Sequence, residues 1–171
     1  MDSFRGEIPC SLLEKWKARM PTRAQSYRLR KGRISETGRI YMISTATENR
    51  CPVFNDWQLG RLVVLEFKRA ERQGLVTSLA WVVMPDHFHW LVELQQGSLA
   101  SLIKQVKASS AVLINRASGK QGQLWQTGFH DKALRRDADL QKLARYIVAN
   151  PLRAGLVNRI GDYPLWDAVW V

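Results

Sequence analysis

The chain has 171 residues, which suits one compact domain with an arm and is too short for two full domains. Apolar residues make up 46% of it, which excludes wholesale disorder. No uncharged apolar stretch has the length of a membrane span or the place of a secretory signal. The two cysteines, Cys10 and Cys51, make neither a disulfide framework nor a paired zinc signature. We therefore expect a soluble, cytoplasmic protein that does not engage a membrane.

Positive charge dominates the sequence. Lysine and arginine number 26 against 15 aspartates and glutamates, which leaves a net charge of +11. Such an excess increases self-repulsion and favours a polyanionic partner, and nucleic acid is the partner whose phosphates suit it best. A role in solubility alone is the weaker explanation, because acidic residues serve solubility equally well.

Residues 1–39 hold more than half of this charge, since ten basic residues against four acidic ones give +6. We expect residues 1–38 to form a basic arm, residues 39–160 a folded domain and residues 161–171 a tail. A solvated, partly ordered arm is the usual interpretation of such a charge run. The overall charge favours an arm that binds nucleic acid. Its candidate contacts are Arg28, Arg30, Lys31 and Arg33.

Two kinds of hydrophobic periodicity alternate along the rest of the chain. Alternation of apolar and polar residues predicts strands, and apolar residues three and four apart predict helices. In chain order these patterns give a strand at 39–47, a helix at 56–74, strands at 79–84 and 87–94, a helix at 98–119, a strand at 129–134 and a helix at 138–150. Pro85 and Asp86 fall between the two adjacent strands and predict a tight turn.

Capping residues set the expected ends of the helices. Asp56 and Ser98 suit the N-cap position, and Gly74 and Gly119 suit the residue just past the last turn. Pro151 is expected to stop the last helix, because the residue before a proline avoids helical backbone angles. The tail is expected to dock on the domain through three aromatic residues, Tyr163, Trp166 and Trp170.

The order strand-helix-strand-strand-helix-strand, followed by a helix, is that of a ferredoxin-like split βαβ fold of the α+β class. It predicts one antiparallel sheet with helices on one face and an added C-terminal helix. The other face is expected to stay open, an arrangement that many nucleic-acid-binding proteins use.

Histidine occurs three times, and two of the three stand in the run His87-Phe88-His89. Because side chains alternate along a strand, both imidazoles point to one face, and the helices receive Phe88, Trp90, Val92 and Leu94. Two neighbouring imidazoles on an open face could hold one metal ion. The pair alone is more often a coincidence than a site, and it is incomplete, since catalytic metal sites usually have about three protein ligands.

The last helix supplies Tyr146 and Asn150, which are four residues apart and therefore lie on one helical edge, about 5–6 Å apart at Cβ. Spacing alone favours a tyrosine at the rim of the core with its hydroxyl in water, and an asparagine that ends a helix before Pro151. Beside the histidine pair a second interpretation arises. The amide oxygen of Asn150 could complete a metal shell, with the phenol of Tyr146 one turn away.

Four segments of the sequence resemble a known family, the bacterial single-tyrosine transposases with an HUH motif. They are residues 84–92 (MPDHFHWLV), similar to the HUH motif itself; 145–157 (RYIVANPLRAGLV), similar to the catalytic-tyrosine helix of one branch, the REP-associated tyrosine transposases; and 38–41 (GRIY) and 124–131 (LWQTGFHD), which match the same branch. The resemblance covers roughly residues 38–160 with order and spacing intact. Its most specific part runs from Tyr146 to Pro151.

The resemblance implies a role for each candidate side chain. His87 and His89 would ligate a divalent ion, and Tyr146 would be the nucleophile. The third ligand, four residues after the tyrosine, falls on Asn150, where insertion-sequence relatives often have glutamine. His130 is the rival, since its imidazole could bind the ion, contact phosphate or cap a strand. The family implies Mg²⁺ or Mn²⁺, whereas imidazole ligands by themselves would suit zinc.

The implied activity is cleavage and strand transfer of single-stranded DNA near hairpins, with repeated extragenic palindromes as targets. Tyrosine attack would leave a covalent 5′-phosphotyrosine and a free 3′-hydroxyl, and a phenol needs a nearby cation or base for this step. Residues 39–160 would then be the catalytic domain. Lys104 and Lys107 would hold the DNA backbone together with the arm.

Two alternatives remain at this point. A non-catalytic nucleic-acid-binding module on the same fold would bind DNA without forming an adduct. A zinc hydrolase would use all three histidines and would not need Tyr146. The choice between a monomer and a homodimer is also open, because insertion-sequence relatives form dimers with exchanged helices and the REP-associated branch tends towards monomers.

Overall fold

The computed structural model describes residues 35–135 and 139–170, and all of them belong to one compact unit, Gly32–Val171. The basic residues proposed as contacts in the arm, Arg28, Arg30, Lys31 and Arg33, lie outside the described residues. Within the described ranges, no helix is both long and apolar enough to cross a membrane.

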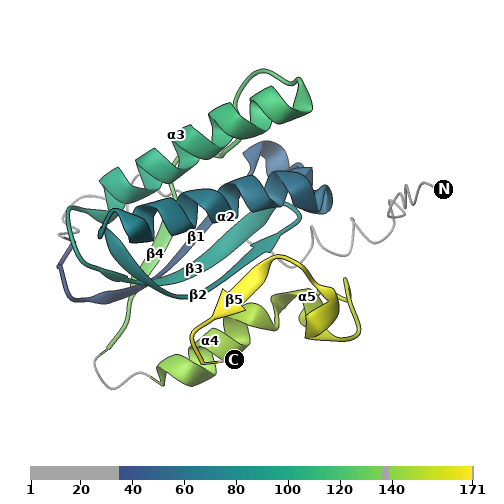
Figure 1. The fold of residues 1–171 in the computed structure, drawn as a ribbon. Helices are drawn as coiled ribbons and strands as arrows, with labels where there is room; N and C mark the ends of the chain where they lie inside the picture. Colours follow the sequence, from purple (N-terminus) through teal and green to yellow (C-terminus); the bar gives the residue numbers. More distant parts are fainter. Residues whose placement is uncertain (1–34, 136–138, 171) are drawn as a thin grey trace. The chain divides into compact units, whose positions relative to one another are not determined.

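One antiparallel sheet of five strands organises the domain (Figure 1). In the order in which they lie side by side, its strands are β4 (His130–Ala133), β1 (Ile40–Ala46), β3 (His87–Leu94), β2 (Val76–Met84) and β5 (Trp166–Ala168). Strands β1 to β4, together with the two helices that lie between them in the sequence, confirm the predicted ferredoxin-like α+β fold. β5 is a further strand at the edge, where the sequence predicted only a docked tail.

Helices α2 (Trp57–Arg72) and α3 (Leu99–Ser118) cover one face of the sheet (Figure 1). The side chain of Asp56 caps α2 by accepting a hydrogen bond from a backbone amide of the first turn. Ser98 begins a reciprocal capping box at the start of α3, and Gly119 follows its last residue with a left-handed φ of 65°. The predicted capping residues of these two helix starts and of the end of α3 are confirmed.

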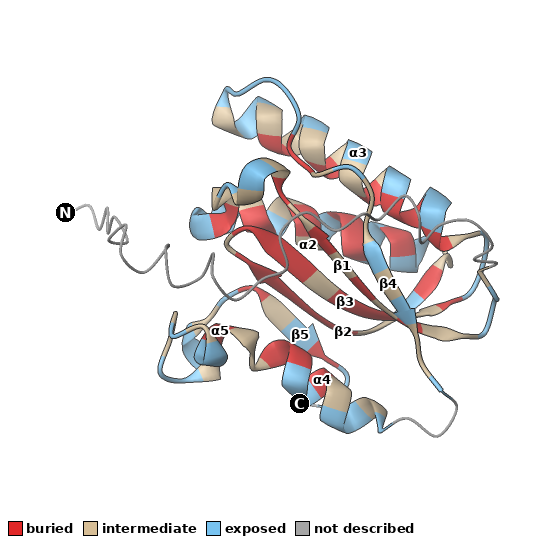
Figure 2. Cartoon of the chain, turned by 180° about the vertical axis from the view of Figure 1, so that it is seen from behind, coloured by how far each residue is buried: buried red, intermediate tan, exposed pale blue. Residues whose placement is uncertain are grey.

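The core between the sheet and these two helices is rich in aromatic residues. Four alternate residues of β3 are fully buried there: Phe88, Trp90, Val92 and Leu94 (Figure 2). The ring of Phe67 on α2 stacks on Trp90, with centroids 4.3 Å apart, and meets Phe88 edge-on. The predicted register of β3 is therefore confirmed, and it sends His87 and His89 to the opposite face.

The opposite face of the sheet is only half open. Helix α4 (Leu140–Val148) packs against β2, β3 and β5 on this face, and it buries Ala144, Ile147 and Val148 (Figure 1). The prediction of an open face is therefore wrong for the half formed by β2 and β5, because an amphipathic helix must bury its apolar stripe. On the half formed by β1 and β4, His130 is exposed.

The predicted last helix is in fact two helices. α4 ends at Val148, and a short helix α5 (Asn150–Arg153) follows directly, with Pro151 in its first turn. Proline is tolerated there because the first N–H groups of a helix have no partner within it. The expectation that Asn150 avoids helical angles before Pro151 is therefore wrong: α4 ends two residues earlier, at Val148, and Asn150 is the first residue of α5. Three short 3₁₀ helices complete the described structure: η1 (Glu48–Arg50), η2 (Val53–Asn55) and η3 (Ile160–Asp162).

Candidate active site

Two imidazoles meet on the face of β3 that is turned towards α4. His87 is the first residue of the strand and His89 the third, so their side chains project to the same side. Their ring centroids are 4.9 Å apart, with the planes at 82°. His87 is buried, with 4% of its surface exposed, and His89 is half-buried. Two rings at this separation can serve as ligands of one ion.

Each imidazole is held through its Nδ1 atom. His87 Nδ1 donates to Asp86 Oδ1 at 2.6 Å, and His89 Nδ1 lies 2.6 Å from Ser44 Oγ on β1. Hydrogen bonds of this kind fix the tautomer and the orientation of metal-binding histidines. Because the Asp86 carboxylate accepts the Nδ1 proton, Nε2 of His87 keeps the lone pair that binds a cation, and the contact with Ser44 orients the ring of His89, so the donor set fits a divalent ion.

Arg50 contacts the other oxygen of Asp86. The Nη1 atom of Arg50 is 3.3 Å from Asp86 Oδ2, so this carboxylate joins an imidazole to a guanidinium. Asn49 and Arg50 both have left-handed backbone angles, with φ of 52° and 55°. Such angles cost a non-glycine residue about 1–2 kcal/mol, and strained backbone of this kind often occurs at functional sites. Here it forms the turn from which Arg50 reaches Asp86.

His89 is neutral at physiological pH. Burial lowers its pKa from the usual 6.5 to about 3, and repulsion from His87, Arg50 and Arg153 acts in the same direction, with Asp86 opposing. A neutral imidazole keeps the lone pair that a metal ligand must donate. The environment of His89 therefore favours the protonation state that can bind a cation.

Tyr146 lies on the outer side of α4, with 56% of its surface exposed. The guanidinium of Arg153 on α5 stacks over the phenol ring, 3.8 Å from its centroid. Arg153 Nη2 also donates to Asn150 Oδ1 at 2.8 Å, and Asn150 Nδ2 donates to the carbonyl oxygen of Ile147 at 2.7 Å. Arg153 therefore links the candidate nucleophile to the candidate third ligand.

The charge of Arg153 also acts on His89. It is one of the charges that lower the pKa of His89, and α4, which carries Tyr146, packs against β2 and β3. Arg153 thus contacts Tyr146 and Asn150 and acts electrostatically on His89. The Oδ1 atom of Asn150 has two lone pairs, so its bond to Arg153 leaves capacity for a cation.

His130 lies on the same face as His89 but two strands away. It pairs with Ser44, and Ser44 pairs with His89, so β1 separates the two imidazoles. Adjacent strands are about 4.8 Å apart, which puts roughly 10 Å between the backbones that carry them. In the described part of the chain, no three His, Cys, Asp or Glu side chains group to hold a metal. The spacing disfavours His130 as a ligand of an ion shared by His87 and His89.

The two lysines proposed to hold DNA both lie on α3, which covers the face opposite to the histidines. Lys107 donates to the carbonyl oxygens of Gln126 and Gly128, so it fastens the loop before β4 to α3. Lys104 is exposed. A role of either lysine at the DNA backbone stays a prediction, and the contacts of Lys107 are structural.

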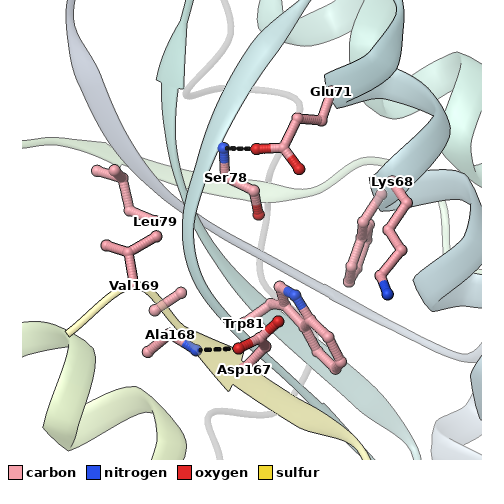
Figure 3. A pocket seen from close by; sticks show the side chains of 10 residues that line it. Lys68, Glu71, Ser78, Leu79, Trp81, Asp167, Ala168 and Val169 are labelled. Atoms are coloured by element: carbon pink, nitrogen blue, oxygen red, sulfur yellow. Dashed lines mark hydrogen bonds between the residues drawn. The ribbon is translucent and has the colours of Figure 1, made fainter. Parts of the chain in front are cut away.

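A cleft opens between α2, β2 and β5 (Figure 3). Trp81 and Asp167 line it together with Glu71, which accepts a hydrogen bond from the amide of Ser78. Trp81 pairs with Trp90 in the sheet register and so points to the helix-covered face. The sheet therefore separates this cleft from the histidine pair, and the cleft is no part of the candidate site.

The sequence pointed to the histidines, the tyrosine and the asparagine but not to the residues that support them. Asp86 was predicted only as a turn residue, and Ser44, Arg50 and Arg153 were given no role. For Ser44 a signal existed, because pairing the predicted strands 39–47 and 87–94 puts it beside the histidines. Arg153 lies within segment 145–157, but the family resemblance of that segment implied roles for Tyr146 and Asn150 only.

Known proteins resemble this chain over most of the described domain. A family model described as Transposase IS200 like matches residues 37–150, which include all four candidate site residues. The chain is 31% identical over 110 residues to the REP-associated tyrosine transposase of Escherichia coli K12, covering 63% of this chain and 62% of that protein. A Haemophilus influenzae protein provisionally given the same name is 27% identical over 114 residues, with 58% and 65% covered. The chain therefore spans less than two thirds of the length of these relatives.

The solved structure of a REP-associated tyrosine transposase bound to a REP hairpin has the same fold. The two align with a TM-score of 0.62 and 24% identity, over 78% of this chain and 79% of that one. The family match extends over 114 of the 171 residues. The chain belongs to the IS200-like transposase family, and within it resembles the REP-associated tyrosine transposases.

Proposed function

We propose that the protein cleaves and rejoins single-stranded DNA beside hairpins, with Tyr146 as the nucleophile and His87 and His89 as ligands of a divalent ion. One observation carries the proposal: Arg153 contacts both Tyr146 and Asn150, and its charge acts on His89. The contacts of this one side chain support an assignment in which the candidate nucleophile and the candidate ligands act together. Membership of the IS200-like transposase family supports the same assignment.

The ion would be held by Nε2 of His87, Nε2 of His89 and Oδ1 of Asn150. A bound Mg²⁺ or Mn²⁺ supplies electrostatic polarisation and orientation of the scissile phosphate. Asp86 and Ser44 support this role by fixing the two rings through Nδ1. The lowered pKa of His89, about 3, supports it as well, because the imidazole stays neutral.

In the first step, the phenolic oxygen of Tyr146 would attack the scissile phosphorus as the bond from phosphorus to the 3′-oxygen breaks. The phenol loses its proton, and the 3′-oxygen leaves as a hydroxyl, so the products are a 5′-phosphotyrosine and a 3′-hydroxyl end. In the second step, the 3′-hydroxyl of another strand attacks the phosphotyrosine and releases Tyr146. Each step exchanges one phosphodiester for another, so the reaction needs no nucleotide cofactor.

The proposed substrate is a single strand next to a palindromic, REP-like hairpin. The names of the relatives and the hairpin bound by the structural relative support this choice. In this scheme residues 1–38 are a DNA-binding arm, 39–160 the catalytic domain and 161–171 a tail. The net charge of +11 supports a polyanionic partner.

The test is to incubate the full chain with labelled hairpin-bearing single-stranded DNA and Mn²⁺ and to separate the products on a denaturing gel. We expect a covalent protein–DNA adduct and a shortened labelled strand. Tyr146→Phe should remove both and leave DNA binding intact, because only the nucleophilic oxygen is lost. Tyr163→Phe is the matched control: it also removes one hydroxyl, which here donates to the carbonyl oxygen of Val83, and it should still form the adduct.

Two outcomes would contradict the proposal. Undiminished adduct with Tyr146→Phe would exclude this tyrosine as the nucleophile. Tight DNA binding by the wild-type chain without any adduct, in Mn²⁺ or Mg²⁺, would instead identify a non-catalytic nucleic-acid-binding module.

A further inference from the structure

We infer that Arg153 is a positioning residue, which fixes the ring of Tyr146 and the amide of Asn150 in one arrangement for attack on DNA. The inference rests on the proposed function, because it assigns a task to Arg153 only if Tyr146 is the nucleophile. Arg153 is not itself one of the groups proposed to bind the ion or to attack phosphorus.

Tyr146 has little else to hold it. Its side chain is 56% exposed on the outer side of α4, whereas its neighbour Ile147 is fully buried. An exposed tyrosine exchanges between rotamers within nanoseconds unless a neighbour restrains it. The guanidinium of Arg153 supplies that restraint by stacking 3.8 Å from the ring centroid, well inside the range of a cation–π contact.

The break between α4 and α5 matters for this contact. Arg153 follows Tyr146 by seven residues, which would be about 10.5 Å along one continuous helix. The interruption at Ala149, where ψ is 3°, and the start of α5 at Asn150 break this regular helical path. The long arginine side chain, which in a helix leans back towards the N-terminus, then covers the remaining separation.

The same guanidinium also orders Asn150. Its carbon atom Cζ lies 3.8 Å from the centroid of the Tyr146 ring while one N–H donates to Asn150 Oδ1 at 2.8 Å. Arginine can make both contacts at once because its donors lie in a rigid planar fork, and lysine cannot reproduce the pair. Arg153 therefore couples the orientation of the nucleophile to that of the candidate third ligand.

Two consequences for the reaction follow. A nucleophile held in one orientation avoids misplacement, and a displacement of about 1 Å can lower a rate roughly 100-fold. The guanidinium beside the phenol also stabilises the negative charge that develops on the phenolic oxygen as it loses its proton during attack. Loss of Arg153 should therefore slow the covalent step more than it weakens DNA binding.

The experiment measures single-turnover adduct formation over a range of hairpin DNA concentrations with Mn²⁺. Arg153→Ala should lower the maximal rate roughly 10- to 100-fold and change the half-saturating DNA concentration little. Arg153→Lys should recover part of the rate, because it keeps the charge, and Arg153→Gln should not. The matched control is Arg145→Ala, which removes the same charge from the residue beside Tyr146 on α4 and should stay close to wild type.

A second measurement does not depend on activity. With 3-fluorotyrosine in place of the four tyrosines, the resonance that disappears in Tyr146→Phe reports on Tyr146 by ¹⁹F NMR. Arg153→Ala should move that resonance towards the position of free fluorotyrosine, and Arg145→Ala should leave it in place. An unmoved resonance in Arg153→Ala would overturn the inference even if the wild-type chain formed no adduct.

Two kinetic results would also overturn the inference. In one, Arg153→Ala and Arg145→Ala form adduct at equal rates. In the other, the whole defect of Arg153→Ala lies in the half-saturating DNA concentration, as expected of a simple DNA contact. Failure of the proposed function looks different, because Tyr146→Phe would then still form the adduct or the wild type would form none.

Discussion

Asp86 and Ser44 hold the two imidazoles through hydrogen bonds at Nδ1. The Asp86 carboxylate accepts the Nδ1 proton of His87 and so sets which nitrogen of that ring can bind a cation, and Ser44 orients the ring of His89. Strand alternation was enough to predict that His87 and His89 share a face. It could not predict the contact between Arg50 and Asp86, because that contact depends on a left-handed turn at residues 49 and 50.

Replacing Asp86 by asparagine should weaken metal binding. The substitution keeps the shape of the side chain but removes the charge that orients His87. Changes of this kind typically cost about 10- to 100-fold in metal affinity. Calorimetric titration with Mn²⁺ measures the effect. Glu93→Gln is the control, since it removes the same charge from the same face of β3, and equal losses in both variants would refute the role of Asp86.

His89 should make the metal-free protein less stable in mild acid. Its pKa is about 3 in the folded state and near 6.5 in the unfolded chain, so between these values only the unfolded chain takes up the proton. The stability it provides is complete above pH 6.5 and falls as the pH drops towards 3. At pH 5 this amounts to about 2 kcal/mol, from 1.5 pH units at 1.36 kcal/mol each.

Urea unfolding in EDTA at pH 7.5 and pH 5 measures that loss. His89→Gln should lose less stability between the two values than the wild type, because the titrating group is gone. His130→Gln replaces an exposed histidine and should retain the wild-type pH dependence. Parallel pH dependence in wild type and His89→Gln would argue against the burial effect.

At the scale of helices and strands, local signals predicted more than long-range ones. Capping residues such as Ser98 and Gly119 act within one turn, so the ends of α3 could be read from the sequence. The stripe with Ala144 and Ile147 predicted that α4 is amphipathic but not which half of the sheet receives it. β5 was missed because three residues carry too little pattern, and its pairing with β2 is a long-range contact.

Gly60→Ala should destabilise the fold although alanine favours helices. In an isolated helix the change would stabilise by about 1 kcal/mol. On α2, however, the new Cβ would lie 2.4 Å from a methyl carbon of Leu165, which is itself buried with 2% exposure. Overpacking of this kind costs about 1–3 kcal/mol, so we expect a net loss in the free energy of unfolding, measured by urea titration.

A double-mutant cycle with Leu165→Ala identifies the cause. Once the large side chain is removed, adding Gly60→Ala should be neutral or stabilising, because only the helix preference remains. Gly161→Ala is the control for the added methyl group, since no atom lies within 4 Å of its Cβ position. If Gly60→Ala were equally harmful with and without Leu165, the contact between α2 and the segment before β5 would not be the reason.

For the molecule as a whole, charge predicts how DNA affinity responds to salt. Replacing Arg28, Arg30, Lys31 and Arg33 together by alanine should weaken binding of single-stranded DNA and flatten its salt dependence. If all four contact phosphates, the slope of log K against log salt should fall by about 3, at roughly 0.7 per contact. Fluorescence anisotropy at several salt concentrations measures both quantities.

A second variant, which loses the same number of positive charges outside the arm, distinguishes direct contacts of the arm from the overall electrostatic field of the protein. Lys68, Arg72, Arg116 and Lys120 lie on or next to the helices that cover the face opposite to the histidines, and all four are exposed. Their replacement by alanine should change the slope much less. Equal changes in the two variants would mean that net charge, rather than the arm, governs binding.

The lengths of the five strands limit how this protein can associate with itself. The long strands β2 and β3, of nine and eight residues, each have partners on both sides, whereas the edges described are β4 with four residues and β5 with three. Short edge strands offer few unpaired backbone groups to a neighbouring copy and so protect against aggregation. A continuous sheet shared between two copies at either of these edges would therefore gain few backbone hydrogen bonds.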